Sequence, residues 1–316
     1  MIWLGVLICS AMGYGIGEAK LNYPVKPIEM IVAYPAGGGQ DVNMRILAKH
    51  AEKYVGVRVV VINKVGGAGV IGNTEMAKAK PDGYTLGTLH TGAVTDELTI
   101  KGLPYTHKSF IPIIRMGADP HVLVIKNSFN MDFKQFIEYA KRSPGKVAIG
   151  IGGIWTTHDF FRVKMEKVIG LQFLRTPFQG GAPAVQAVAG GHIDCSIPLI
   201  TEGLPSIEGK LVTPIAISGP ERSPSLPNVP TVKELGYDVV QIMWRGISVP
   251  PGTPEEIITF LEDGFLKTCN DPEFQADLRK AGGTPSCMNR KEFTKFYEEE
   301  FKSYSAIVKE LGIEPK

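Results

Sequence analysis

The alternation of apolar and polar positions predicts strands that are each followed by a helix. Apolar residues fill 28–34 and 57–62, and amphipathic helical patterns follow them at 41–54 and near 71–79. Further predicted strands lie near 84–89, 121–125, 146–151, 172–176, 193–197, 212–217 and 239–249, and further helices near 132–142, 157–168, 182–189, 254–268 and 290–311. This order predicts an α/β protein with parallel-rich sheets covered by helices.

Two connectors interrupt this order and indicate two lobes. One lies at 117–120, and the other is the proline-rich segment 223–230. We expect lobe I to comprise 20–120 plus 238–316 and lobe II to comprise 121–237, with strands crossing between them. A cleft between two lobes is a common position for a small-ligand site.

The first nineteen residues differ from the rest of the chain. Residues 2–16 are almost wholly apolar, and Gly17-Glu18-Ala19 has the small-x-small pattern of a signal-peptidase site. The run is shorter than the roughly 20 apolar residues of a membrane span, and no Lys or Arg precedes it. We interpret 1–19 as a secretory signal peptide with a truncated basic region.

Composition and cysteine content narrow the possible classes. A net charge of +2 over 316 residues, with Lys and Arg dispersed, argues against nucleic-acid binding. The histidines lack metal-ligand spacing, so no metal site is predicted. An exported chain can oxidise Cys269 and Cys287, which lie close in sequence. A large core does not require disulfides, however, so the sequence favours free buried thiols, Cys195 included.

A glycine-rich turn between the first strand and the first helix is the strongest local signal. Three glycines follow Tyr34-Pro35-Ala36, and the helix begins at Asp41. Such a turn aims free backbone N–H groups and the positive end of a helix dipole at one point. The segment therefore predicts an anion site, for phosphate or carboxylate.

A nucleotide-dependent α/β enzyme is the less favoured alternative. Gly67, Gly69 and Gly72 match G-x-G-x-x-G, but the next strand ends at His90 without the acidic residue that would bind a ribose. The loop is also the second βα turn rather than the first. No P-loop, G-x-S-x-G or H-E-x-x-H pattern occurs, and Cys195 and His192 would point to opposite faces of a strand. No catalytic residue is predicted.

Many short segments, in order, resemble one family over nearly all of the chain after residue 22. They are Tyr23-Pro24, Lys26-Pro27, 34–39 with Asp41 and Arg45, Asn63-Lys64, 66–72, 81–86, 103–105, 139–141, 144–146, 180–184, 190–194, 227–231, 244–246 and 250–254. This set is similar to the tripartite tricarboxylate transporter receptors, the Bug-type periplasmic solute-binding proteins.

The resemblance implies a two-lobed type II periplasmic-binding-protein fold, with a ligand cleft between the lobes that closes on a small organic acid. It implies a periplasmic monomer without cofactor or catalysis, which delivers its ligand to a membrane permease of one large and one small subunit. A receptor that signals to a membrane sensor protein is an alternative that the residues do not separate from transport.

Carried over residue by residue, the resemblance implies ligand-binding positions in both lobes. In lobe I they are Tyr34, Ala36, Gly37, Gly38 and Asp41, with Gly67, Ala68 and Gly69 nearby; in lobe II they are Gly152, Gly153, Thr156, Thr157, His158, Gln179, Gly180 and Gly181. For Asp41 a structural role is favoured, as a helix cap paired with Arg45, because a carboxylate repels an acidic ligand.

Two departures from the family pattern suggest further ligand contacts. Trp155, after Ile154, stands where small residues are common, and an indole beside the cleft would stack on a flat apolar ligand. Arg245 stands where an apolar residue is usual and, if it faces the cleft, would grip a second carboxylate. Otherwise Trp155 is an exposed lid residue and Arg245 a surface charge.

Overall fold

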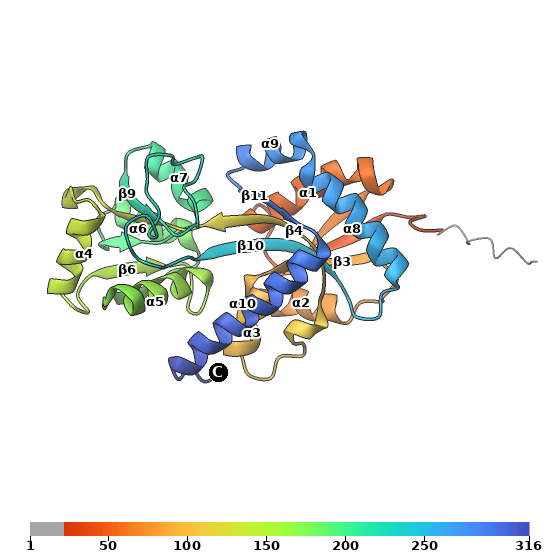
Figure 1. The fold of residues 1–316 in the computed structure, drawn as a ribbon, viewed down its shortest axis with the longest axis horizontal. Helices are drawn as coiled ribbons and strands as arrows, with labels where there is room; N and C mark the ends of the chain where they lie inside the picture. The colour runs from red at the N-terminus through yellow and green to blue at the C-terminus, as the bar shows by residue number, and fades with distance from the viewer. Residues whose placement is uncertain (1–21, 316) are drawn as a thin grey trace, which may run out of the picture.

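The computed structural model describes residues 22–315 and shows two α/β lobes side by side (Figure 1). The predicted signal segment 1–19 lies outside the described residues. The larger sheet contains β1 (Ile28–Val32), β2 (Val59–Asn63), β3 (Thr85–His90), β4 (Ile111–Pro120), β10 (Ile242–Val249) and β11 (Pro285–Met288). The smaller contains β5 (Val122–Lys126), β6 (Ala148–Ile151), β7 (Leu174–Pro177), β8 (Cys195–Ser196) and β9 (Val212–Ile217).

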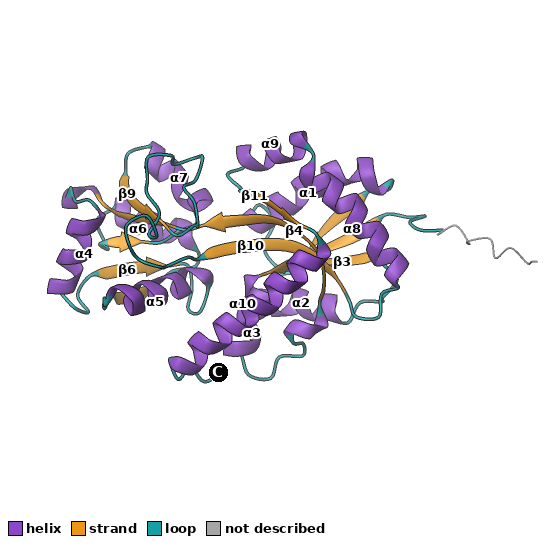
Figure 2. Ribbon diagram, in the orientation of Figure 1, coloured by secondary structure: helices purple, strands orange, loops and turns teal. Residues whose placement is uncertain are grey.

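Helices cover both faces of each sheet (Figure 2). Those around the larger sheet are α1 (Gly39–Val55), α2 (Val70–Ala77), α3 (Thr91–Thr99), α8 (Glu255–Asn270), α9 (Pro272–Lys280) and α10 (Arg290–Glu310). Those around the smaller sheet are α4 (Phe133–Arg142), α5 (Thr157–Ile169), α6 (Gly181–Ala189) and α7 (Ile200–Glu208). Among the described residues, no helix has the length and apolar character of a membrane-spanning segment.

Both sheets are mixed. The six-stranded sheet has the order β11-β4-β10-β3-β1-β2, and the five-stranded sheet has the order β7-β6-β8-β5-β9. Strand β1 is parallel to β2 and β3, and β6 is parallel to β7 and β8, whereas β10 and β5 run antiparallel to their neighbours. The expectation of parallel-rich sheets therefore holds for the βα units and fails where the chain crosses between lobes.

Strands β4 and β10 are the crossing strands, and they lie side by side between the two lobes (Figure 1). Their antiparallel pairing runs from Ile242 opposite Pro120 to Val249 opposite Ile111. Since β4 leads directly into β5, the chain enters the smaller sheet just after Pro120. We propose, on this basis, the lobe boundaries 20–120 plus 238–316 and 121–237.

Apolar side chains fill the space on each face of both sheets. On the larger sheet, α1, α8 and α9 pack on one face around Leu47 and Phe265, while α3 and α10 enclose Trp244 and Tyr297 on the other. On the smaller sheet, α4 and α5 cover one face, and α6 and α7 cover the other. Strands buried on both faces read as continuous apolar runs, as β5 does, which is why the pattern identified them.

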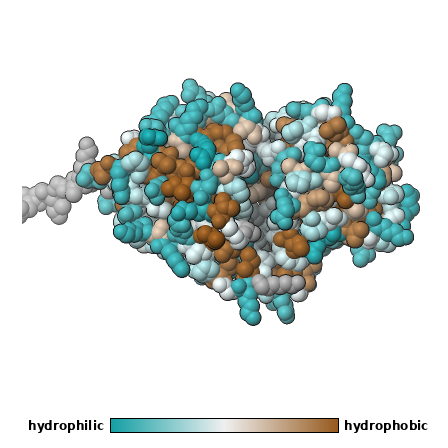
Figure 3. Space-filling model, turned by 180° about the vertical axis from the view of Figure 1, so that it is seen from behind, coloured by the Kyte–Doolittle hydropathy of each residue, from teal (hydrophilic) through white to brown (hydrophobic). Residues whose placement is uncertain are grey.

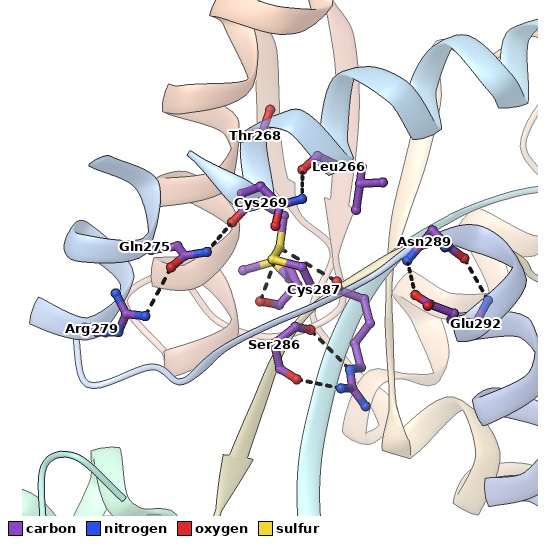
Figure 4. Close-up of a disulfide and its surroundings, with 12 residues drawn as sticks. Leu266, Thr268, Cys269, Gln275, Arg279, Ser286, Cys287, Asn289 and Glu292 are labelled. Atoms are coloured by element: carbon purple, nitrogen blue, oxygen red, sulfur yellow. Dashed lines mark hydrogen bonds between the residues drawn. A yellow bond between two sulfur atoms is a disulfide. The ribbon is translucent and has the colours of Figure 1, made fainter. Parts of the chain in front are cut away.

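A disulfide joins Cys269, near the end of α8, to Cys287 in β11, so the expectation of free thiols is wrong for this pair (Figure 4). The two Cα atoms lie 5.9 Å apart, within the range that a disulfide spans. Helix α9 turns the chain back toward α8, and sequence spacing alone does not reveal that approach. Cys195 is a buried free thiol, as expected.

Candidate ligand-binding site

A cavity of about 590 Å³ is lined by residues of both lobes. In the view from behind, the surface has a groove between the two lobes (Figure 3). The lining from lobe I is Tyr34, Pro35, Gly38, Gly39, Gln40, His90, Gly92, Thr95, Asp96, Thr99, Ile100, Met243 and Arg245. The lining from lobe II is Gly152, Ile154, Trp155, Thr156, Thr157, His158, Gly180, Leu199, Thr201 and Glu202.

Five helices begin at this cavity. Their N-cap residues, all of which line it, are Gly38 of α1, His90 of α3, Thr156 of α5, Gly180 of α6 and Leu199 of α7. Each N-terminus carries backbone N–H groups without an intrahelical acceptor and a partial positive charge. At Gly38 and Thr156 no side chain caps the helix, so these ends are available to an anion, whereas at the start of α6 the Gly181 N–H donates to Glu202.

The glycine-rich turn before α1 is shaped by Asp41. Gly37 adopts φ 79°, a conformation that favours glycine, and its N–H donates to Oδ2 of Asp41 at 2.9 Å. Arg45 and Asn63 also donate to this carboxylate. Burial raises the pKa of Asp41, but these hydrogen bonds outweigh burial and hold it below its usual range. Asp41 thus stabilises the turn from behind the cavity wall.

Arg245 is buried in the cavity wall, with 2% of its surface exposed. Its guanidinium forms an ion pair with the buried carboxylate of Asp119 on β4. Burial lowers the pKa of Arg245 to about 10, so the side chain stays cationic at neutral pH. The alternative prediction, that Arg245 is a surface charge, is therefore wrong, because β10 is a central strand that turns the side chain inward.

Two other buried side chains of lobe I carry polar atoms without a hydrogen-bond partner among the described residues. Within residues 22–315, neither Nε2 of His90 nor the side-chain amide of Gln40 has a hydrogen-bond partner, and both residues are at least nine-tenths buried. Nδ1 of His90 accepts the Gly92 N–H at 2.9 Å, which places the proton of the neutral ring on Nε2. Burial and the nearby Arg245 lower the pKa of His90 to about 3. His90 therefore presents a neutral N–H donor.

Two acidic residues also line the cavity. Asp96 accepts the Tyr105 hydroxyl at 3.0 Å, and burial raises its pKa to about 7. Glu202 contacts Nε2 of His158 at 2.9 Å and accepts the backbone N–H groups of Leu199 and Gly181. Burial raises the pKa of Glu202, but these hydrogen bonds hold it below its usual range.

Trp155 contributes to the cavity wall from the loop before α5. Its backbone N–H donates to Oδ2 of Asp159 at 3.0 Å, and the Arg175 guanidinium lies over the indole, 5.3 Å from the ring centroid. Trp155 has φ 57°, an uncommon conformation for a bulky residue that only a well-determined environment maintains. The indole is thus held at the cleft rather than lying on an open lid.

The structure brings together part of the set predicted from the sequence. The cavity is lined by Tyr34, Gly38, Gly152, Trp155, Thr156, Thr157, His158, Gly180 and Arg245. Among the described residues, the lining does not include Ala36, Gly37, Asp41, Gly67, Gly69, Gly153, Gln179 or Gly181. Gly67, Ala68 and Gly69 form the short 3₁₀ turn η1 (Gly67–Gly69).

The second glycine loop serves packing between α2 and β1. A Cβ at Gly72 would lie 2.7 Å from Cα of Ala33 and 2.8 Å from the carbonyl oxygen of Lys64. The last glycine of G-x-G-x-x-G therefore permits close helix–strand contact. This role requires no nucleotide.

Residues 43–313 match the model of the family described as the tripartite tricarboxylate transporter family receptor. The chain belongs to this receptor family. It is 33% identical over 315 residues to the UPF0065 protein in the gbd 5' region of Cupriavidus necator, covering 96% of this chain and 94% of the relative. The solved TctC solute binding protein from Polaromonas is 30% identical, with a TM-score of 0.79 over 91% of this chain and 99% of that one.

The fold also resembles that of a protein determined with adipate. The R. palustris protein Rpa4515, determined with adipate, has a TM-score of 0.81 and 24% identity, covering 93% of this chain and all of that one. The family and these structures establish the two-lobed solute-binding fold predicted from the sequence.

Proposed function

We propose that this protein is an extracytoplasmic receptor that captures a small carboxylated metabolite by lobe closure. The observation that carries the proposal is the meeting of five helix N-termini, from both lobes, at one cavity. Positive helix ends favour an anion, and those of α1 and α5 have no side-chain cap. The buried donors on Arg245 and His90 require an acceptor that the described side chains only partly supply.

A carboxylate suits this lining better than a phosphate. The cavity wall contains one fixed cation among its described residues, Arg245, and two acids, Asp96 and Glu202. A doubly charged phosphate would meet more repulsion than a singly charged carboxylate group. The likeness in fold to a protein determined with adipate supports the same class.

The ligand is delivered, under this proposal, to a membrane permease of one large and one small subunit, and the receptor acts in the periplasm as a monomer without catalysis. Family membership supports this role. Closure places lobe II groups such as Thr156 on a ligand already seated on α1, so the bound anion shifts the open–closed equilibrium.

Binding is tested by calorimetric titration and thermal shift of the purified protein against carboxylates, phosphonates, amino acids and nicotinamide cofactors. Saturation at 100 times the dissociation constant adds about 2.7 kcal/mol of stability, which is a shift of a few degrees. Stabilisation by carboxylates supports the proposal. A response to nicotinamide cofactors alone contradicts it. Ligand uptake by cells with and without the receptor gene then tests delivery.

A further inference from the structure

We propose that the cavity takes a monocarboxylate with an apolar, preferably aromatic, body, and that Glu202 occupies the place of a second carboxylate. This inference rests on the proposed function, since it concerns the ligand class of the same site. It is carried by the partners of Glu202, by the charges of the lining and by the position of Trp155.

Glu202 binds lobe II as a ligand carboxylate would. Its Oε1 accepts the Gly181 N–H at 3.3 Å, at the start of α6, and its Oε2 accepts the Leu199 N–H at 2.8 Å, at the start of α7. Oε2 also contacts Nε2 of His158 at 2.9 Å. A Cβ on Gly181 would meet Oε2, so the carboxylate packs directly on the backbone. Two of the five helix N-termini are therefore already occupied by an anion of the chain itself.

A second ligand carboxylate in lobe II would lie beside Glu202. Two neighbouring carboxylates repel each other strongly where water is excluded. The fixed cation of the described lining, Arg245, lies in lobe I and is paired with Asp119. Lobe II offers only the uncapped N-terminus of α5, at Thr156, and His158 is already in contact with Glu202, so its described lining compensates two carboxylates poorly.

Lobe I retains a seat for one carboxylate. The uncapped N-terminus of α1 at Gly38 and Gly39 faces the cavity, and the nearest atom to a Cβ at Gly39 would be Nη2 of Arg245, at 3.8 Å. Nε2 of His90 and the amide of Gln40, both buried without a partner, border the same space. Most of these groups are hydrogen-bond donors, which is what one bound carboxylate requires.

Much of the remaining wall is apolar, although Asp96 and the threonines Thr95, Thr99, Thr157 and Thr201 also line it. Ile100 and Met243 come from lobe I, and Ile154, Trp155 and Leu199 come from lobe II. The backbone N–H of Trp155 is held by Asp159, and the Arg175 guanidinium lies over the indole. A rigid aromatic side chain at a cleft favours a flat apolar group through stacking and burial.

Matched ligand pairs test the inference in the unaltered protein. We expect calorimetry to give a dissociation constant for 4-methylbenzoate that is at least tenfold below that for terephthalate. The dissociation constant for hexanoate should likewise be below that for adipate. In each pair, a methyl group replaces the second carboxylate. A dicarboxylate that binds as tightly as its partner overturns the inference and leaves the proposed function standing. If no carboxylate binds, both fail.

Variants test which residues cause the preference for monocarboxylates. Glu202→Gln retains an acceptor oxygen for one of the two N–H groups and removes the charge, so we expect the preference for 4-methylbenzoate over terephthalate to fall at least fivefold. Glu208→Gln, an exposed acid at the end of the same helix, should leave the preference unchanged. Trp155→Ala should weaken 4-methylbenzoate more than hexanoate. An unchanged preference in a folded Glu202→Gln protein overturns the role of Glu202.

Discussion

The guanidinium of Arg245 and the carboxylate of Asp119 form a buried ion pair between the two strands that cross from one lobe to the other. Arg245 lies on β10 opposite Gly117, and Asp119 lies on β4 opposite Met243. Asp119 also accepts the Thr284 N–H at 2.8 Å. The pair thus connects the ligand cavity, the crossing strands and the segment that leads into β11.

Replacing Arg245 by Ala is expected to weaken carboxylate binding at least tenfold and to lower the free energy of unfolding by about 3–5 kcal/mol, because Asp119 is left buried without a cation. The measurements are calorimetric affinity and urea denaturation. Arg279→Ala, on the exposed face of α9, is the control.

Arg245→Met combined with Asp119→Asn removes both charges and should recover stability but not affinity. Recovered affinity in the double variant would refute a direct role of Arg245 in binding.

Asp96 should make the protein less stable as pH rises. Burial raises its pKa from 3.8 to about 7, so the folded state holds a proton that the unfolded state releases from about pH 4 upward. Stability is then lost between those values, and the loss persists above pH 7. Asp96→Asn retains an acceptor for Tyr105 and removes this penalty. We expect it to stabilise the protein by roughly 1–2 kcal/mol at pH 8 and by little at pH 4. An equal effect at both pH values contradicts this.

Gly72→Ala is expected to destabilise the protein by about 3 kcal/mol or more, since the new methyl group meets the backbone of Ala33, just after β1, and of Lys64, just after β2. Thermal unfolding measures the loss. Gly39→Ala adds a methyl group whose nearest neighbour is 3.8 Å away, and serves as the folding control. Equal melting temperatures for the two variants would show that α2 can shift away from β1.

Loss of the Cys269–Cys287 disulfide should lower stability by about 3 kcal/mol, which is the loop-closure entropy for the 18-residue separation. Cys269→Ser combined with Cys287→Ser is compared with the unaltered protein by denaturant unfolding. Cys195→Ser provides the control for thiol substitution. A reducing agent should lower the melting temperature of the unaltered protein and leave that of the double variant unchanged.

The sequence predicted the elements whose apolar pattern is continuous and missed those whose pattern is broken. Helix α7 contains Gly203 and Pro205, and strand β4 contains Pro112 and Gly117, so neither has a clear periodicity. The short α3, α9 and β11 were missed as well. Glu202 and Asp119 lie on two of these elements, and their roles were therefore not predicted.

Apart from Arg245 on β10, the predicted site residues that line the cavity lie in turns after parallel strands or in the first turn of the helix that follows, where local sequence determines the geometry. Gly38 and Thr156 belong to such turns. Gln40 and His90 were not predicted, although each is adjacent to a segment that the sequence singled out. Their significance comes from missing hydrogen-bond partners, which only the packed structure reveals.

The uncapped N-termini of α1 and α5 belong to different lobes and border the same cavity. Both ends carry positive partial charge, so in an empty receptor they repel each other across the gap and resist closing. An anion between them reverses the sign of that force. Closure of the two lobes then depends on the charge of the ligand and not on its shape alone. A neutral amide of the same outline would fill the cavity and leave the two halves apart.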